Sequence, residues 1–442
     1  MIFKRKLYEE MLLWKQEQNG KTALLIKGAR RVGKSTLVEE FAKKEYKSYI
    51  LIDFSEKNKR IDALFDDISD LDFFFMRLQQ ETHKNLHERN SVIIFDEVQL
   101  QPLARQAIKH LVKDGRYDYI ETGSLLTLKR NVQNILIPSE ETRLTLYPLD
   151  FEEFLWATGK ETGLSILRLF YEKHIPLGAS HRNTLRDLRL YMLVGGMPQA
   201  INTYLETNNL QQVDNTKRNI LALYDDDFRK IDSTGQASRM LRAIPSQLTT
   251  NARRFQISTA IDGRKTDDSE TIIADMEDSM VINLAYHCND PNVGLALSRS
   301  SKNYKMFLAD TGLFITLAFR DKKFTENLIY NKLLSDKLEA NLGYVYENLV
   351  AQMLRTAGNE LYYYTFPTEN EKHNYEIDFL LSRGNKLMPI EVKSSGYKTH
   401  KSLDVFCEKF SSRIGERILL YTKDYAKDGQ TTCTPVYFTP FL

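Results

Sequence analysis

The sequence predicts an α/β protein whose N-terminal part is a parallel sheet covered by helices. Over residues 1–150, short β-rich runs alternate with helical patterns. Continuous apolar runs, as opposed to alternating ones, indicate strands buried on both faces, as in parallel sheets. A glycine-rich loop follows the first run, and two carboxylates follow the third. Strands are expected at residues 22–27, 48–54, 91–95, 117–120 and 143–147, and helices at 34–45 and 103–113.

The composition is that of a folded protein with several domains. Its 442 residues correspond to roughly three domains of about 150 residues each. Apolar residues make up 42%, and the low counts of 20 Gly and 11 Pro argue against disordered or repetitive segments. The formal net charge of +2 does not mark a nucleic-acid-binding protein, although it leaves room for a local basic face.

The chain is expected to be cytoplasmic and not to enter a membrane. Its cysteines, Cys288, Cys407 and Cys433, are far apart and form neither a disulfide framework nor a zinc motif. Charges or amides interrupt every apolar run near the N-terminus, so no signal peptide is expected. No apolar run approaches the roughly 18 residues of a membrane-spanning helix.

A phosphate-binding motif lies between the first expected strand and the first expected helix. Residues 28–35 (GARRVGKS) fit the pattern G-x-x-x-x-G-K-[ST] in full. The glycines let backbone N–H groups face a phosphate, catalytic Lys34 would reach the β- and γ-phosphates, and Ser35 would ligate Mg²⁺. The expected ATP-binding residues are Gly28, Ala29, Arg30, Arg31, Val32, Gly33, Lys34, Ser35 and Thr36.

Two carboxylates end the third expected strand. Residues 92–95 (VIIF) run directly into Asp96 and Glu97, at the end of a strand where ligands gather in open α/β sheets. Asp96 is expected to hold Mg²⁺, and Glu97 to polarise the attacking water as general base. Taken alone, the pattern also fits a strand entering a solvated loop. The glycine-rich loop is what favours the catalytic interpretation.

Two further positions could complete the site. Either Thr122 or Ser124, after the fourth strand, could sense the γ-phosphate, or its hydroxyl could instead cap the next helix. Arg143 and the pair Arg30 and Arg31 are candidates for an arginine finger, although surface arginines are common.

These residues resemble the AAA-superfamily ATPases that carry an uncharacterised C-terminal domain. The likeness rests on residues 28–37 (GARRVGKSTL), 93–99 (IIFDEVQ), 121–124 (ETGS) and 143–155. It extends over most of the chain through residues 194–198 (VGGMP), 308–313 (LADTGL), 346–350 (YENLV) and 390–393 (IEVK). The resemblance implies ATP binding and Mg²⁺-dependent hydrolysis. Thr142 stands where the family often has glycine, which makes the assignment of Arg143 less secure.

A second group of charged residues lies near the C-terminus. Asp378 sits in residues 376–381 (EIDFLL), and Glu391 and Lys393 follow in an E-x-K pattern on one strand face. The arrangement resembles the PD-(D/E)xK nuclease fold. Asp378 and Glu391 could bind Mg²⁺ while Lys393 orients a water, and Glu347 matches an extra acid of many such nucleases. An edge strand with alternating charges would look the same.

The predicted architecture has four parts. A P-loop NTPase sheet occupies residues 1–155, and a helical lid occupies residues 156–230. A winged-helix-like segment at 231–320 precedes a restriction-endonuclease-like α/β domain at 321–442. An amphipathic helix is expected at residues 269–282, and simple three-helix packing is the alternative for the winged-helix-like segment.

Two functions compete at this point. In the first, ATP hydrolysis drives or gates a C-terminal nuclease-like domain that acts on DNA or RNA. In the second, the chain is a nucleotide-dependent switch or binding module whose C-terminal domain cuts nothing, which the near-neutral charge favours. Assembly into a homo-oligomer, which an arginine finger supplied in trans would require, stays open.

Overall fold

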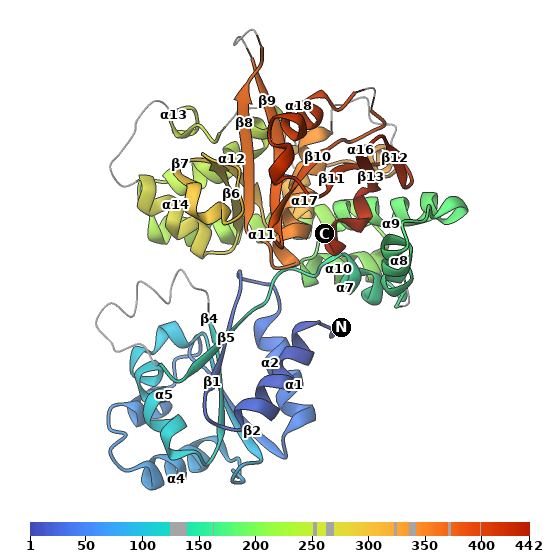
Figure 1. Ribbon diagram of the computed structural model, residues 1–442. Coiled ribbons are helices and arrows are strands. Elements are labelled where there is room, and N and C mark those ends of the chain that lie inside the picture. Colours follow the sequence, from blue (N-terminus) through green and yellow to red (C-terminus); the bar gives the residue numbers. More distant parts are fainter. Residues whose placement is uncertain are drawn as a thin grey trace. The chain divides into compact units, whose positions relative to one another are not determined.

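The computed structural model describes the chain except residues 124–138, 162, 251–253, 262–268, 322–324, 336–341, 370–372 and 398. The described residues form two compact units, each with its own sheet (Figure 1). The first unit contains Met1–Tyr147 and Asp278–Met280, and the second contains Pro148–Glu277 and Val281–Leu442. Ser124, one of the two sensor candidates, lies outside the described residues. The predicted domain boundaries at residues 155 and 230 stay predictions.

The first unit is built on a five-stranded parallel sheet, which confirms the α/β prediction for this part of the chain. Its strands are β1 (Ala23–Lys27), β2 (Ser48–Asp53), β3 (Ser91–Asp96), β4 (Asp118–Gly123) and β5 (Glu141–Thr145). They lie in the order β2-β3-β4-β1-β5, with parallel pairing throughout. Strand β4 therefore separates β1, which enters the glycine-rich loop, from β3, which ends in Asp96.

Helices cover both faces of this sheet, with α1 and α2 on one side and α4 and α5 on the other (Figure 1). The helical segments are α1 (Leu7–Gln18), α2 (Lys34–Glu45), α3 (Lys59–Asp62), η1 (Ala63–Phe65), α4 (Leu71–Thr82), η2 (Val98–Leu100) and α5 (Pro102–Asp114). The face under α4 and α5 holds a core of buried side chains that includes Phe75, Phe95, Leu111 and Tyr119. Burying both faces explains the continuous apolar runs of β1 and β3, whereas the edge strand β5 carries charged residues and is only partly buried.

The chain is helical after residue 150, as the sequence predicts. The helices are α7 (Phe151–Ala157), α8 (Gly163–Glu172), α9 (His181–Val194), α10 (Pro198–Thr207), α11 (Leu210–Ile231), α12 (Gln236–Thr249), α13 (Ile257–Ala260) and α14 (Ser269–Asp278). Asp150 and Glu153 form a reciprocal capping box that starts α7. The break between α9 and α10 needs glycine, because a Cβ at Gly196 would lie 2.1 Å from the carbonyl oxygen of Leu149.

The second unit contains an eight-stranded mixed sheet in the order β12-β13-β11-β10-β9-β8-β6-β7. Its strands are β6 (Ile282–Cys288), β7 (Arg299–Leu308), β8 (Leu361–Pro367), β9 (Asn374–Arg383), β10 (Lys386–Val392), β11 (Arg417–Tyr421), β12 (Ala426–Asp428) and β13 (Thr431–Pro435). The remaining helical segments are η3 (Gly178–Ser180), η4 (Leu295–Ser298), α15 (Thr311–Ala318), α16 (Asn327–Leu334), α17 (Gly343–Thr356), α18 (Lys401–Lys409), η5 (Ser411–Arg413) and η6 (Val436–Phe441).

The segment expected to resemble a winged helix differs from that expectation. Its strands β6 and β7 join the C-terminal sheet, since β6 pairs in parallel with β8, so this sheet crosses the boundary expected at residue 320. The helix expected at 269–282 ends at Asp278. Met280 then takes a left-handed conformation with φ of 59°, and Ile282 begins β6. Over the described residues, every helix is too short or too polar to cross a bilayer.

Candidate functional site

The glycine-rich loop connects β1 to α2, as predicted, and its glycines are required by the backbone. Gly33 has φ of 96°, a left-handed conformation that residues with a Cβ rarely adopt. At Gly28 the constraint is space, because a Cβ would lie 2.4 Å from the carbonyl oxygen of Leu146, just beyond β5. Arg31 is also left-handed, with φ of 70°. The loop thus has the tight curl that turns backbone N–H groups toward an anion.

Lys34 is buried within the loop that it ends. Its Nζ donates hydrogen bonds to the carbonyl oxygens of Gly28 at 3.0 Å and Ala29 at 3.1 Å. Burial lowers the pKa of Lys34, and the carboxylates of Glu97 and Asp96 act in the opposite direction. The positive charge of the Arg30 guanidinium also lowers this pKa. Loop carbonyls therefore hold the ammonium where a phosphate would replace them as partner.

Asp96 connects the loop to the neighbouring strands. The hydroxyl of Ser35 donates to Oδ1 of Asp96 at 3.0 Å, and the hydroxyl of Thr122, on β4, donates to the same oxygen. Thr122 Oγ1 in turn accepts a hydrogen bond from the backbone N–H of Glu97 at 3.2 Å. The order β3-β4-β1 explains this meeting, because the carboxyl ends of all three strands lie at one edge.

Glu97 follows Asp96 in a left-handed conformation, with φ of 53°. Its carboxylate accepts a hydrogen bond from the amide of Gln99, which is buried. The sequence analysis did not single out Gln99, although its spacing of two residues from Glu97 is visible in the sequence. Gln99 fixes the direction of the carboxylate that is expected to act as base.

Arg5 is a second residue that the sequence analysis missed. It precedes α1, is 6% exposed, and donates to the carbonyl oxygens of Val32 at 3.0 Å and Tyr147 at 2.6 Å. One side chain thus ties the glycine-rich loop to the segment that leaves β5. A lone arginine near an N-terminus carries no local signal of such a role.

Arg143 lies on the edge strand β5 and is half-exposed. Its Nε donates to Glu141 at 2.6 Å, and Glu141 also pairs with Arg105 of α5, at 2.6 Å. Arg105 in addition binds Glu121 of β4 at 2.7 Å, and these side chains of Arg105, Glu121 and Glu141 are at most 4% exposed. The arginine-finger role of Arg143 stays a prediction, and the structure adds the buried Arg105 cluster beside it.

The C-terminal acids meet where β9 and β10 pair. Asp378 accepts a hydrogen bond from the backbone N–H of Val392 at 2.7 Å, and Lys393 Nζ lies 2.6 Å from Oε1 of Glu391. Glu391 is 5% exposed, and its second oxygen, Oε2, has no hydrogen-bond partner among the described residues. Burial raises the pKa of Asp378 well above its ordinary value, and the charges of neighbouring acids raise it further.

Glu347, on α17, joins this cluster as the sequence predicts, and two unpredicted residues join it as well. Lys305, on β7, forms a short ion pair with Glu376 of β9, and its Nζ lies 3.6 Å from Oε2 of Glu347. Burial raises the pKa of Glu347, and Lys305 opposes that rise. Lys305 belongs to the segment expected to be a separate winged helix, which is why the sequence did not place it here.

Among the described residues, few protein ligands are available for the expected Mg²⁺. Over the described ranges, no group of three or more His, Cys, Asp or Glu side chains is arranged to hold a metal ion. Mg²⁺ often takes only one or two protein carboxylates and completes its shell with water and phosphate. The pair Asp378 and Glu391, with one buried carboxylate oxygen lacking a partner, fits that pattern.

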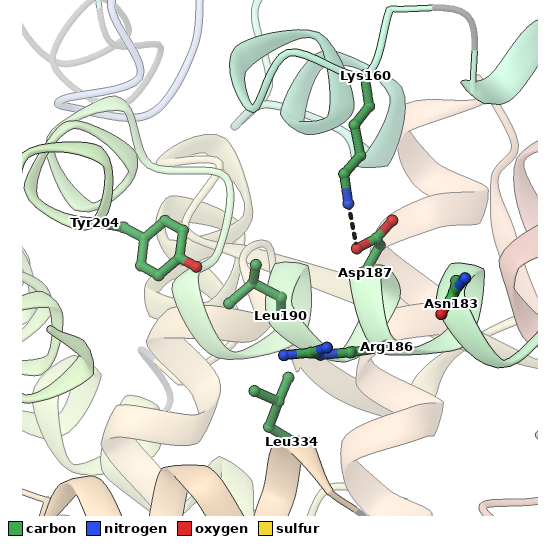
Figure 2. Close-up of a pocket in the computed structure, with 7 residues that line it drawn as sticks. All are labelled: Lys160, Asn183, Arg186, Asp187, Leu190, Tyr204 and Leu334. Atoms are coloured by element: carbon green, nitrogen blue, oxygen red, sulfur yellow. Dashed lines mark hydrogen bonds and ion pairs between the residues drawn. The ribbon is translucent and has the colours of Figure 1, made fainter. Parts of the chain in front are cut away.

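A cavity of about 390 Å³ lies in the second unit, beside α9 and α10 (Figure 2). Its lining residues are Lys160, Asn183, Arg186, Asp187, Leu190, Tyr204 and Leu334. Figure 2 shows the ion pair between Lys160 and Asp187, whose atoms lie 2.5 Å apart. None of the predicted site residues lines this cavity, so it supports neither candidate site.

Comparison with known families identifies the class of the first unit. A family model described as an AAA domain matches residues 20–155, which contain the glycine-rich loop, Asp96 and Glu97. Two domains of unknown function match further along, DUF8612 at residues 185–323 and DUF4143 at residues 342–438. The chain thus carries an AAA domain, and the nuclease-like assignment of its C-terminal part is not supported by a family match. No curated protein matches the chain.

Three solved structures are similar to this chain at low identity. PCH-2 of C. elegans is 15% identical over 47% of this chain and 65% of its own, just under two thirds, with a TM-score of 0.26. The Drosophila ORC bound to DNA is 12% identical over 67% of this chain and 90% of its own, with a TM-score of 0.29. Cdc6p from Pyrobaculum aerophilum is 9% identical over 76% and 94%, with a TM-score of 0.25. Scores this low carry no argument about function.

Proposed function

We propose that the first unit binds ATP with Mg²⁺ and hydrolyses it. The observation that carries this proposal is the meeting of Lys34, Ser35 and Asp96, in which the Ser35 hydroxyl and the Asp96 carboxylate are 3.0 Å apart. These are the hydroxyl and carboxylate that hold Mg²⁺ in P-loop NTPases. The AAA match over the same residues supports the proposal.

Each residue has a distinct role in this proposal. Backbone N–H groups of the loop and the start of α2 bind the phosphates, and Lys34 exchanges its carbonyl partners for phosphate oxygens. Ser35 and Asp96 would hold Mg²⁺, which neutralises charge on the phosphates when bound. Glu97 accepts a proton from the attacking water, and Thr122 links Glu97 to Asp96.

Replacing Lys34 by alanine is expected to weaken ATP binding at least tenfold, because the phosphates lose a charge-assisted hydrogen bond, and tenfold corresponds to about 1.4 kcal/mol. Calorimetry with Mg²⁺ and a non-hydrolysable ATP analogue measures the effect. Lys21→Ala, at an exposed lysine of the same unit, serves as control and should bind like the wild type. Equal affinity of Lys34→Ala and wild type would show that the nucleotide binds elsewhere.

The proposal has a second part, in which the nucleotide state gates the C-terminal part of the chain, which acts on nucleic acid. The convergence of Asp378, Glu391, Lys393 and Glu347 supports it, since an acid pair beside a lysine is suited to phosphodiester hydrolysis. Asp378 and Glu391 would hold Mg²⁺, which stabilises charge on the scissile phosphate when bound. Lys393 orients the attacking water.

The covalent connection between the units supports gating. The chain passes from the first unit to the second between Tyr147 and Pro148. The carbonyl oxygen of Tyr147 is held by Arg5, which also holds the carbonyl oxygen of Val32 in the glycine-rich loop. A shift of the loop on nucleotide binding therefore changes the anchoring of the residue that precedes the second unit.

Within the second unit, a series of hydrogen bonds begins at Leu149, just after the connection between the units. The carbonyl oxygen of Leu149 accepts from the Tyr191 hydroxyl at 2.9 Å, and that hydroxyl accepts from the Gln352 amide at 2.8 Å. Gln352 lies on α17, the helix that carries Glu347. The buried chain of polar groups thus leads from the entry of the second unit to the helix of the C-terminal acid cluster.

One observation favours the alternative of a switch that cuts nothing. Lys305 and Lys393 already pair with Glu376 and Glu391, so part of the acid cluster is neutralised without any metal. In this alternative the cluster stabilises the second unit, and ATP controls the recognition of a partner.

Asp378→Asn is expected to abolish Mn²⁺-dependent cleavage while ATP turnover stays at the wild-type rate. The amide loses the negative charge on which cation binding depends. The assay incubates the full chain with single- and double-stranded DNA and RNA, with and without ATP. Glu408→Gln, at an exposed acid on α18, is the control and should cut like the wild type. Absence of cleavage by the wild type on every substrate would instead favour the switch.

A further inference from the structure

The acid cluster of the second unit is short of positive charge. Four carboxylates, of Glu347, Glu376, Asp378 and Glu391, share two ammonium groups. The formal excess is two negative charges, the charge that one divalent cation neutralises. Burial raises the pKa values of Glu347 and Asp378, and the negative charges of neighbouring carboxylates raise them further.

Lys305 reaches the cluster from β7 and is held rigidly. Its side chain is 6% exposed, pairs with Glu376, lies 3.6 Å from Glu347, and has its Nζ 5.5 Å from the ring centre of Tyr363. Farther along β7, Leu308 bonds through its backbone to Asn348, the neighbour of Glu347 on α17. Strand and helix therefore fix the ammonium between the two carboxylates.

We propose that Lys305 is a resident cation, whose ammonium takes the place of a metal ion at Glu347 and Glu376 and leaves Asp378 and Glu391 to a single divalent ion. The inference rests on the acid pair of the second part of the proposed function. It explains why the described residues hold no group of three metal-binding side chains although four carboxylates converge. It also gives the buried, unpartnered oxygen of Glu391 a partner, namely the single divalent ion bound by Asp378 and Glu391.

The ammonium makes the remaining site weaker than its carboxylates alone would be. Like charges a few ångströms apart in a partly buried site repel by more than the thermal energy. Removing the charge of Lys305 therefore has two effects. It frees the carboxylates of Glu347 and Glu376, and it removes the repulsion between the ammonium and a divalent cation. Both changes favour a divalent cation, so tighter binding is expected from the loss of a residue that contacts no metal.

Calorimetric titration of the full chain with Mn²⁺, without nucleotide, tests the inference. Lys305→Met is expected to bind Mn²⁺ at least tenfold more tightly than the wild type. Lys305→Arg, which retains the charge, and Lys302→Met, at an exposed lysine of the same strand, should bind like the wild type. Adding Asp378→Asn to Lys305→Met should remove the gain, which places the ion in this cluster and not beside Asp96.

Lys305→Met could fail to fold, since it leaves buried carboxylates close to one another without the ammonium. A double variant controls for this. The double variant Lys305→Met with Glu376→Gln removes one charge of each sign and should fold, and it too should bind Mn²⁺ more tightly than the wild type. Thermal denaturation adds a second measurement, in which Mn²⁺ should raise the Tm of Lys305→Met more than that of the wild type.

The outcomes separate this inference from the proposed function. Wild-type binding that depends on Asp378 but does not tighten in Lys305→Met or in its double variant with Glu376→Gln would overturn the role of Lys305 and leave the acid pair standing. Absence of Mn²⁺ binding in the wild type and in both variants would overturn the acid pair as well. Neither result tests the proposed ATP binding, which depends on Lys34 in the first unit.

Discussion

Replacing Glu97 by glutamine is expected to lower ATP turnover at least about a hundredfold while ATP binding is retained. The amide is nearly the same size as the carboxylate and can keep the contact with Gln99, but it cannot accept a proton from the attacking water. Burial lowers the pKa of Lys34, and the carboxylate of Glu97 opposes this lowering, so the two side chains interact. The loss should therefore fall on the chemical step.

The measurement combines steady-state ATP turnover with calorimetry of ATP binding on the same preparation. Glu40→Gln is the matched control, because Glu40 lies on α2 and its ion pair with Lys44 is at the surface. It should turn over ATP like the wild type. A Glu97→Gln protein that hydrolyses ATP at the wild-type rate would mean that another group takes the proton.

The N-terminal part of the fold could be predicted because its signals are local. Helix α2 begins at Lys34 and ends at Glu45, as expected, since the loop motif fixes its start and a run of helix-forming residues sets its length. Strands β2 and β3 begin at Ser48 and Ser91, at the expected positions. In this region an apolar run and the turn that bounds it are enough to define an element.

The residues that surround the candidate sites could not be predicted in the same way. Arg5 meets Tyr147 from 142 positions away, and Lys305 meets Glu376 from 71 positions away. Such contacts follow from strand order, and no local pattern states that β6 pairs with β8 and brings β7 to the C-terminal sheet. The acids were visible in the sequence, whereas the cation between them became visible only in the fold.

Replacing Arg105 by alanine is expected to destabilise the protein by about 3–5 kcal/mol, because it leaves Glu121 and Glu141 buried without their shared guanidinium. Arg105 lies 2.7 Å from Glu121 and 2.6 Å from Glu141, and its side chain is 4% exposed. Chemical denaturation monitored by circular dichroism measures the change.

The loss of stability in Arg105→Ala should increase as pH rises. Burial raises the pKa of Glu121 from its ordinary value to about 8, and Arg105 opposes this rise. Because the folded state keeps a proton that the unfolded state releases between about pH 4.5 and 8, the contribution of Glu121 to stability falls as pH rises through that window. Without Arg105 the folded pKa rises further, so the variant keeps losing stability above pH 8, where the wild type has already released this proton. Relative to the wild type, the variant should therefore lose more stability at about pH 9.5 than at about pH 7.

Arg116→Ala is the control for Arg105→Ala, because it removes an arginine whose ion pairs lie near the surface and not in the buried cluster. Arg116 pairs with Asp72 and Asp114 near the surface, where its side chain is 26% exposed and that of Asp72 is 86% exposed. Solvent screens such pairs, so the change should stay within about 1 kcal/mol and vary little with pH. If Arg105→Ala were as mild as Arg116→Ala and equally insensitive to pH, Glu121 would have to be neutral in the folded protein at both pH values. The buried cluster would then be held by packing, with no contribution from charge.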